Sequence, residues 1–212
     1  MQDWTQRFID LAQQAGALKF GRFELKSGRI SPYFFNAGEF SSGALIAGVA
    51  ACYADAIAAA GPAFDVLFGP AYKGIPLSAT IAMALHERHG IDVPVAYNRK
   101  EAKLHGEGGL VVGAPLAGRA LVVDDVISAG TAFAEAERLI RSAGGRVAGL
   151  ALGLDRQERG TGATSARSEL EERGVAVIAV ATLDDLIDAL ERRDSSSEVL
   201  SDMLAYRARY GA

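Results

Sequence analysis

The chain has 212 residues, of which 50% are hydrophobic and 23% are charged, and its formal net charge is -4. These values exclude a disordered chain and give no general attraction to nucleic acid, so we expect a folded protein without a nucleic-acid partner. One cysteine cannot form an internal disulfide, and one cysteine with three histidines argues against a structural zinc site.

The first residues predict a small appendage that precedes the main domain. Apolar residues at helical spacing predict a helix over residues 3–15. Residues 18–40 alternate in polarity between glycine and proline breaks, which predicts short strands and a hairpin. An alanine-rich helix is then expected from Leu45 to Ala60, where Gly61 and Pro62 end it. We interpret residues 1–43 as a hood and residues 44–212 as an α/β core.

From residue 65 onwards, predicted strands and helices alternate. Strands are expected at 65–68, 93–97, 119–124, 147–154 and 175–181, and helices at 75–89, 132–143, 165–173, 183–193 and 198–209. Continuous apolar strands separated by helices predict a mainly parallel sheet flanked by helices on both faces. Residues 98–109 are expected to form a polar loop. His86 and His89 have no evident acidic partner, and we interpret them as surface residues.

Targeting and membrane signals are also missing from the sequence. The opening residues do not follow the pattern of a secretory signal peptide, and no apolar run reaches the roughly 18 residues that a membrane span needs. We therefore expect a cytoplasmic protein that does not bind membranes.

The segment Leu121–Ala132 places two adjacent acids at the end of a predicted buried strand. A turn of small residues follows and leads into a helix, a setting in which backbone N–H groups bind phosphate. Helix capping is an alternative, although it needs only one acid. The magnesium-binding strand of P-loop NTPases is another, but the sequence has no Gly-x-x-x-x-Gly-Lys-Ser/Thr loop.

Two further segments bring positive charge to predicted strand ends. Gly69–Ile75 carries Lys73 between two glycines, although an ordinary turn with a solvated lysine would look the same. The predicted loop at 98–109 is basic and rich in glycine, which favours a mobile lid over a polyanion. A solvated flexible loop is the alternative. The basic residues of this segment are Arg99, Lys100, Lys103 and His105.

Taken together, these segments resemble the type I phosphoribosyltransferases, whose signature is an apolar strand, two acids and a small-residue phosphate loop. The whole chain is similar to the orotate phosphoribosyltransferase family within that group. The most specific segments are Leu25–Gly38, Tyr72 with Lys73, the four basic residues of the predicted lid, and Asp155 with Arg156. The resemblance implies the type I phosphoribosyltransferase fold, with the hood over the base site.

The resemblance also implies an enzyme that transfers ribose 5-phosphate from phosphoribosyl pyrophosphate (PRPP) to N1 of orotate during pyrimidine synthesis. Asp124 and Asp125 would accept hydrogen bonds from the ribose hydroxyls and stabilise positive charge at C1 in the transition state. Lys73 and Lys103 would assist as catalytic cations. Mg²⁺ is implied as the cofactor, held mainly by PRPP and water near the two acids.

The remaining site residues follow from the same resemblance. The implied PRPP-binding residues are Lys26, Tyr72, Lys73, Arg99, Lys100, Lys103, His105, Asp124, Asp125, Val126, Ile127, Ser128, Ala129, Gly130, Thr131 and Ala132. The implied orotate-binding residues are Lys26, Phe34, Phe35, Ser128 and Arg156, with Arg156 on the carboxylate.

A homodimer is implied too, in which the 99–109 loop of one chain closes over the site of its neighbour. Two rival functions remain at this point. A purine-salvage phosphoribosyltransferase should lack the segment from Lys26 to Phe35, and a PRPP-sensing regulator should carry a basic face or an added DNA-binding domain.

Overall fold

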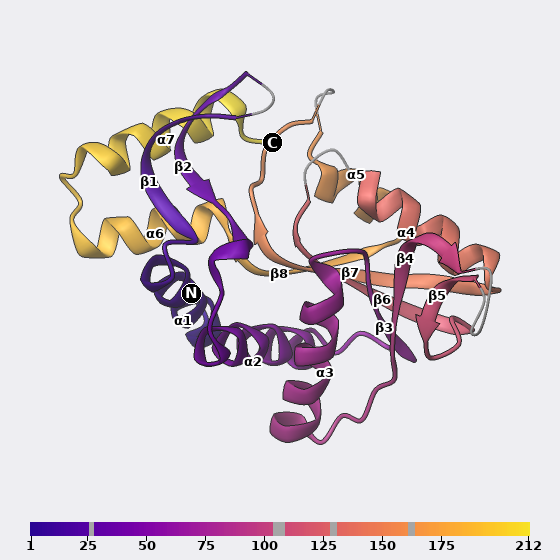
Figure 1. Cartoon of the computed structure of the whole chain (residues 1–212). Coiled ribbons are helices and arrows are strands. Elements are labelled where there is room, and N and C mark those ends of the chain that lie inside the picture. Colours follow the sequence, from indigo (N-terminus) through magenta and orange to yellow (C-terminus); the bar gives the residue numbers. More distant parts are fainter. Residues whose placement is uncertain (26–27, 104–108, 128–130, 161–163) are drawn as a thin grey trace.

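The computed structural model describes residues 1–25, 28–103, 109–127, 131–160 and 164–212 and has an α/β fold (Figure 1). Its centre is a six-stranded sheet with the order β5-β4-β3-β6-β7-β8. Neighbouring strands are parallel except for β4 and β5, so the predicted mainly parallel sheet is confirmed. The strands are β3 (Val66–Gly69), β4 (Val95–Lys103), β5 (Gly109–Gly113), β6 (Gly118–Val126), β7 (Gly145–Asp155) and β8 (Ala176–Thr182).

Helices cover both faces of this sheet because its central strands are apolar on both sides. In β6, Leu121 and Val123 join one buried cluster and Val122 joins the other. The first cluster includes residues of α1 (Asp3–Gln14), α2 (Gly43–Ala60), α3 (Gly74–His89) and α6 (Leu183–Arg193). The second includes residues of α4 (Thr131–Ser142) and α5 (Ala166–Glu172). Because β3, β4, β6, β7 and β8 run in the same direction, their carboxyl ends lie at one edge of the sheet.

The hood is an antiparallel hairpin of β1 (Leu18–Glu24) and β2 (Ile30–Phe35), followed by the short 3-10 helix η1 (Ala37–Glu39). The last helix, α7 (Glu198–Tyr210), packs against β2, as Figure 1 shows. In this contact the rings of Tyr33 and Tyr206 meet edge to face, with centroids 6.2 Å apart. The C-terminal helix therefore supports the hood from behind.

The helix α2 corrects one expectation from the sequence. Among the described residues it is the one helix that is long and apolar enough to cross a membrane by length and composition, so the statement that no run reaches that length was wrong. In this structure α2 packs against α1, α3, β7 and β8. Its apolar composition is accounted for by this place in the core.

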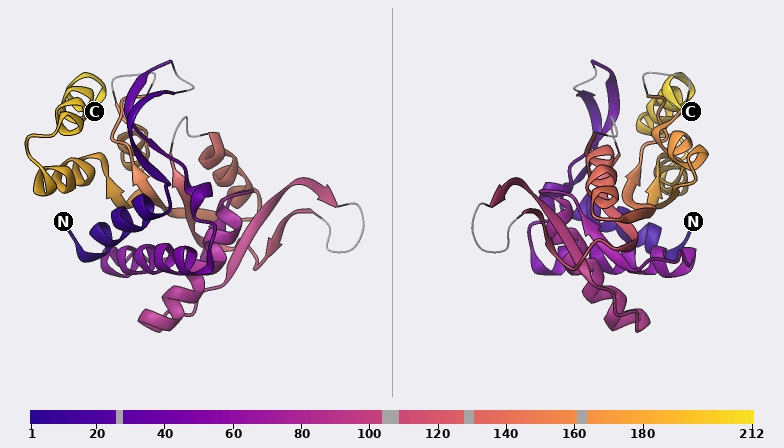
Figure 2. Two further views of the ribbon diagram at one scale, coloured as in Figure 1. Left: turned by 60° about the vertical axis from the view of Figure 1, so that its left-hand side comes forward. Right: turned by 90° about the vertical axis from the view of Figure 1, so that its right-hand side faces the viewer.

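Residues 98–103 and 109 were expected in a loop, and this expectation was also wrong. Residues 98–103 continue β4, and β5 begins at Gly109 and pairs with it antiparallel. Figure 2 shows these two strands as an arm that projects away from the body. Because the outer part of β4 is exposed and polar, it lacks the apolar pattern that marks a buried strand.

His86 and His89 are exposed, as interpreted from the sequence, but His89 has an acidic partner that the sequence did not reveal. Its Nε2 lies 2.9 Å from Oδ1 of Asp55 on α2. Arg7 from α1 and Arg88 from α3 bind the same carboxylate. The partner was missed because it lies 34 positions away in the chain. Asp55 thus links three helices beneath the sheet.

Candidate active site

The site is built where β3 and β6 lie side by side. The chain leaves β3 towards β4 on one side and leaves β6 towards β7 on the other, and such reversals leave a crevice at the carboxyl ends of the strands. The turn after β3 is tight, because a Cβ on Gly69 would lie 2.1 Å from the carbonyl oxygen of Gly74. The backbone N–H of Ala71 donates to Oδ1 of Asn98 at 2.9 Å. These contacts fix the position from which Lys73 extends.

Lys73 and Asp125 form an ion pair across this crevice. Nζ of Lys73 lies 2.5 Å from Oδ2 of Asp125, and the carboxylate is 13% exposed while the lysine side chain is 55% exposed. The other oxygen of Asp125 accepts a hydrogen bond from the backbone N–H of Val126 at 2.9 Å. Asp125 is therefore little exposed and held by the backbone, whereas the side chain of Lys73 is exposed and can change its position.

Asp124 has a different environment from its neighbour. Burial raises the pKa of Asp124 to about 7, and the negative charge of Asp125 adds to the effect. Its Oδ1 accepts a hydrogen bond from the backbone N–H of Asp125 at 2.9 Å. The buried Tyr53 donates its hydroxyl to the backbone carbonyl of Asp124 at 2.8 Å. Tyr53 on α2 thus fixes the backbone of Asp124, and the burial of the Asp124 carboxyl disfavours its ionised form.

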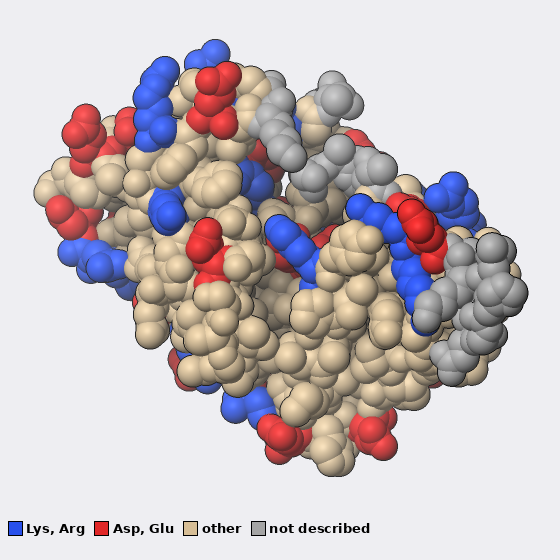
Figure 3. All heavy atoms as spheres, viewed as in Figure 1, with Lys and Arg blue, Asp and Glu red and all other residues tan. Residues whose placement is uncertain are grey.

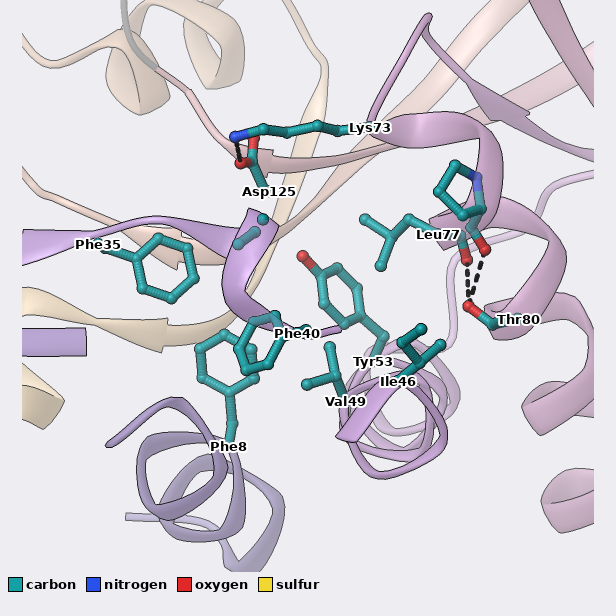
Figure 4. A pocket seen from close by; sticks show the side chains of 13 residues that line it. Phe8, Phe35, Phe40, Ile46, Val49, Tyr53, Lys73, Leu77, Thr80 and Asp125 are labelled. Carbon is teal, nitrogen blue, oxygen red and sulfur yellow. Dashed lines mark hydrogen bonds and ion pairs between the residues drawn. The ribbon is translucent and has the colours of Figure 1, made fainter. Parts of the chain in front are cut away.

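A cavity of about 260 Å³ opens beside the ion pair, and Figure 4 shows Lys73 and Asp125 at its polar side. Its opposite wall is apolar and comes from α1, α2 and the hood, with Phe8, Phe35, Phe40, Val49 and Tyr53 among the lining residues. On the face seen in Figure 3, the hollow next to the hood is bordered by both basic and acidic side chains. The cavity can therefore hold a ligand with a flat apolar part and a charged part.

The start of the arm brings further positive charge to the crevice. Nζ of Lys100 on β4 lies 4.8 Å from the centroid of the Tyr72 ring, which is 64% exposed. Nη1 of Arg99 is buried and has no hydrogen-bond partner within the described part of the chain. Tyr72 and Lys100 thus lie together next to Lys73, and the two lysines concentrate positive charge at this end of β3 and β4.

Arg156 follows β7 and is held on several sides. Its Nε lies 2.8 Å from Oε1 of Glu158, and its guanidinium stacks 4.4 Å above the ring of Tyr33. Nη2 also lies 3.4 Å from the hydroxyl of Ser31 on β2. With 15% of its side chain exposed, Arg156 is a largely buried cation beneath the hood.

The structure separates the two phenylalanines that were predicted to bind the base. Phe35 lines the cavity and its ring lies 6.0 Å from that of Phe8. Phe34, which neighbours it on the strand, is 40% exposed and pairs with Phe23 at 5.6 Å. Only Phe35 reaches the cavity beside Asp125 through its side chain.

The remaining predicted residues fall into two groups, those outside the described residues and those along β4, β6 and α4. Lys26, His105, Ser128, Ala129 and Gly130 lie outside the described residues. For Lys103 and Thr131 the structure describes the backbone, as the last residue of β4 and the first of α4. Val126 ends β6, and Ile127 follows it directly. Ala132 lies in the first turn of α4.

Sequence reasoning missed three residues that contact this site. Tyr53 holds the carbonyl of Asp124, Glu158 binds Arg156, and Tyr206 donates a hydrogen bond to Glu158. Tyr53 and Tyr206 sit at apolar helical positions and look like ordinary core residues in the sequence. Glu158 had one local signal, because it follows Arg156 by two positions at a strand end.

Comparison with known proteins agrees with this geometry. A family model described as a phosphoribosyl transferase domain matches residues 40–163. An orotate phosphoribosyltransferase from Thioalkalivibrio sulfidiphilus is 54% identical over 212 residues, covering 100% of both chains. One from Xanthomonas axonopodis pv. citri is 56% identical over 215 residues, covering 100% of this chain and 98% of its own.

A solved structure is similar over nearly the same extent. The crystal structure of orotate phosphoribosyltransferase from Francisella tularensis aligns with a TM-score of 0.88 at 39% identity. The alignment covers 97% of this chain and 99% of that chain. The similarity therefore includes the hood and the C-terminal helices as well as the sheet.

Proposed function

The chain belongs to the orotate phosphoribosyltransferase family, and from this premise we propose how its residues carry out the reaction. The enzyme transfers ribose 5-phosphate from PRPP to N1 of orotate, a step of UMP biosynthesis. The bond from C1 of the ribose to pyrophosphate breaks, and the bond from C1 to N1 forms. The products are orotidine 5'-monophosphate and pyrophosphate.

The ion pair between Lys73 and Asp125 is the observation that carries this proposal. Without substrate, each side chain balances the charge of the other at 2.5 Å. In the complex, Lys73 turns to the pyrophosphate together with Arg99 and Lys100. Asp125 and Asp124 then accept hydrogen bonds from the ribose hydroxyls. Their negative charge stabilises the positive charge that develops at C1 as pyrophosphate leaves.

The remaining PRPP contacts follow the same logic. The 5-phosphate binds the backbone between Val126 and Ala132, where β6 ends and α4 begins, because the N-terminus of a helix attracts anions. Tyr72, Lys103 and His105 complete the pyrophosphate contacts. Lys26 lies near both substrates.

The base is proposed to bind between the hood and the end of β7. Arg156 pairs with the carboxylate of orotate, and a guanidinium can do so with two parallel hydrogen bonds. Phe35 supports this position, since it lies on the same strand as Tyr33, above which Arg156 stacks. Phe34 contacts the pyrimidine through its backbone, and Ser128 through its hydroxyl.

We also propose that the reaction uses Mg²⁺ and that PRPP and water hold most of it. The donor set fits this arrangement, because within the described ranges no group of three His, Cys, Asp or Glu side chains could hold a metal ion. Mg²⁺ with phosphates needs only one or two carboxylates, and the crevice has Asp124 and Asp125. The ion supplies charge neutralisation on the pyrophosphate.

A homodimer that shares its lids is the corresponding proposal for assembly. The strands β4 and β5 form an arm that projects away from the body in Figure 2. A two-fold dimer would let each arm reach the site of the other chain. The similarity over the full chain to bacterial enzymes supports our further proposal of a soluble, cytoplasmic protein.

The direct test is a spectrophotometric assay of orotate loss in the presence of PRPP and Mg²⁺. Hypoxanthine and adenine serve as control bases, because a purine-salvage enzyme would use one of them. We expect loss of orotate only. Use of a purine in place of orotate would contradict the proposal, as would a protein that binds PRPP without turnover.

A further inference from the structure

Glu158 lies at the centre of a largely buried ion cluster behind the proposed base site. Its Oε1 accepts hydrogen bonds from Nε of Arg156 at 2.8 Å and from the hydroxyl of Tyr206 at 2.9 Å. Its Oε2 accepts from Nη1 of Arg29 at 3.4 Å. The carboxylate is 14% exposed, so solvent screens these contacts only weakly.

Glu158 occupies one edge of the Arg156 guanidinium and leaves another edge available to a ligand. Nε and Nη2 both contact Oε1 of Glu158, at 2.8 and 2.7 Å. Nη1 has no hydrogen-bond partner within the described ranges of the chain. A guanidinium has five N–H donors in a fixed plane, so an acceptor can bind through Nη1, and through Nη2 by replacing its 3.4 Å hydrogen bond to the Ser31 hydroxyl. A ligand cannot bind the guanidinium edge that faces Glu158, because the carboxylate already occupies it.

Charge balance keeps the cluster attractive to an anion. Two guanidiniums, of Arg29 and Arg156, share the single carboxylate of Glu158, which leaves one positive charge in excess. The nearby buried Asp155 is paired with Arg167 at 3.4 Å and does not cancel this excess. Glu158 therefore orients Arg156 without neutralising the cluster.

We propose that Glu158, supported by Tyr206 of α7, is the positioning residue that aims Arg156 at the carboxylate of the base and so determines the preference for an acidic base. The inference rests on the proposed function. It assigns a role in base selection to the C-terminal helix, which lies behind the hood and does not line the cavity. Glu158 acts through Arg156 and is not itself a catalytic residue.

The test compares the steady-state kinetics of Glu158→Gln, Tyr206→Phe and Arg156→Ala, with Glu137→Gln as the matched control. Glu137 is also a little-exposed carboxylate shared by two arginines, Arg141 and Arg173, but it lies on α4 away from the hood. We expect Glu158→Gln to raise the KM for orotate about tenfold, the order of one charged hydrogen bond, with less than about a twofold change in kcat and in the KM for PRPP. Tyr206→Phe should also raise the KM for orotate, by a smaller factor.

A double variant separates positioning from a merely structural role. Adding Glu158→Gln to Arg156→Ala should give no further rise in the orotate KM, since the group that Glu158 aims is already gone. An additive rise would overturn the proposal, and so would an unchanged or lower orotate KM in Glu158→Gln alone. A lower KM would mean that Glu158 competes with orotate for Arg156.

The same experiment distinguishes this inference from the proposed function. If the wild-type chain does not consume orotate, or if Arg156→Ala leaves its KM unchanged, the proposed base site is wrong. If Arg156→Ala weakens orotate and Glu158→Gln does not, only the positioning role is wrong. Should Glu158→Gln unfold while Glu137→Gln does not, Tyr206→Phe alone decides, with an unchanged orotate KM counting against the role.

Discussion

Replacing Asp124 by asparagine should stabilise the free protein while it damages the enzyme. The carboxyl of Asp124 has a pKa of about 7 in the fold against an ordinary value of 3.8, because it is buried next to Asp125. This difference corresponds to about 4 kcal/mol of folding free energy lost when the carboxyl ionises. Asparagine has the same shape and keeps an oxygen for the N–H of Asp125, but it carries no charge.

The gain in stability depends on pH with a definite sign. Below pH 3.8 the carboxyl is protonated in both states, so Asp124 has no ionisation cost there. Between this value and about 7 the folded state keeps the proton that the unfolded state releases, and the free energy of unfolding falls as pH rises. Asp124→Asn should therefore gain about 1 kcal/mol at about pH 4.5 and about 4 kcal/mol at about pH 8.5.

Urea unfolding followed by far-ultraviolet circular dichroism measures both values, and Asp202→Asn on the exposed side of α7 is the matched control. The control should change stability little at either pH. A gain of equal size at both pH values, or a loss at about pH 8.5, would refute the reasoning. Turnover should fall in Asp124→Asn most clearly above about pH 7, where the wild-type carboxyl is ionised, because the charge opposite C1 is then removed.

Three further outcomes are expected. Asp125→Asn should lower kcat much more than it weakens PRPP binding in calorimetry, and near-normal turnover would reduce the acid pair to helix capping. Mixing inactive Lys103→Ala chains with inactive Asp125→Asn chains should restore roughly a quarter of wild-type activity if lids are shared, whereas activity at the parental level would place each lid in its own chain. Gly69→Ala should lower the free energy of unfolding by about 1–3 kcal/mol in denaturant titrations, because its Cβ would lie 2.1 Å from the oxygen of Gly74. Gly43→Ala, which meets nothing within 4 Å, is its control, and equal effects of both would contradict the packing argument.

The buried part of the fold could be predicted from the sequence because burial leaves a local pattern. Apolar runs such as Val122 and Val123 between helical segments specify a parallel sheet, and two acids at the end of one run specify where its ligand lies. The outer part of β4 gave no such signal. Lys100 and Glu101 are exposed and lie where the pairing of β4 with β5 is irregular, between Asn98 and Lys103, so neither burial nor a regular polarity pattern marks this part of the strand in the sequence.

Contacts between distant segments were the other part that the sequence could not give. Asp55 binds His89 from 34 positions away, and Tyr206 reaches Glu158 from 48 positions away. Each residue alone looks like a surface charge or a core aromatic. Only the packing of the helices around the sheet brings Asp55 to its partners on α1 and α3, and Tyr206 to Glu158, which holds Arg156.

The position of α7 against β2 has a consequence for the nascent chain. On the ribosome, β1 and β2 emerge early, the crevice between β3 and β6 follows, and the helix that covers Tyr33 is made after them. Until then the fully buried ring of Tyr33 lacks one of its neighbours, and Glu158 lacks the hydroxyl of Tyr206. The strands of the PRPP crevice are therefore synthesised before α7, and the half of the site for the base is complete only once α7 has packed against β2.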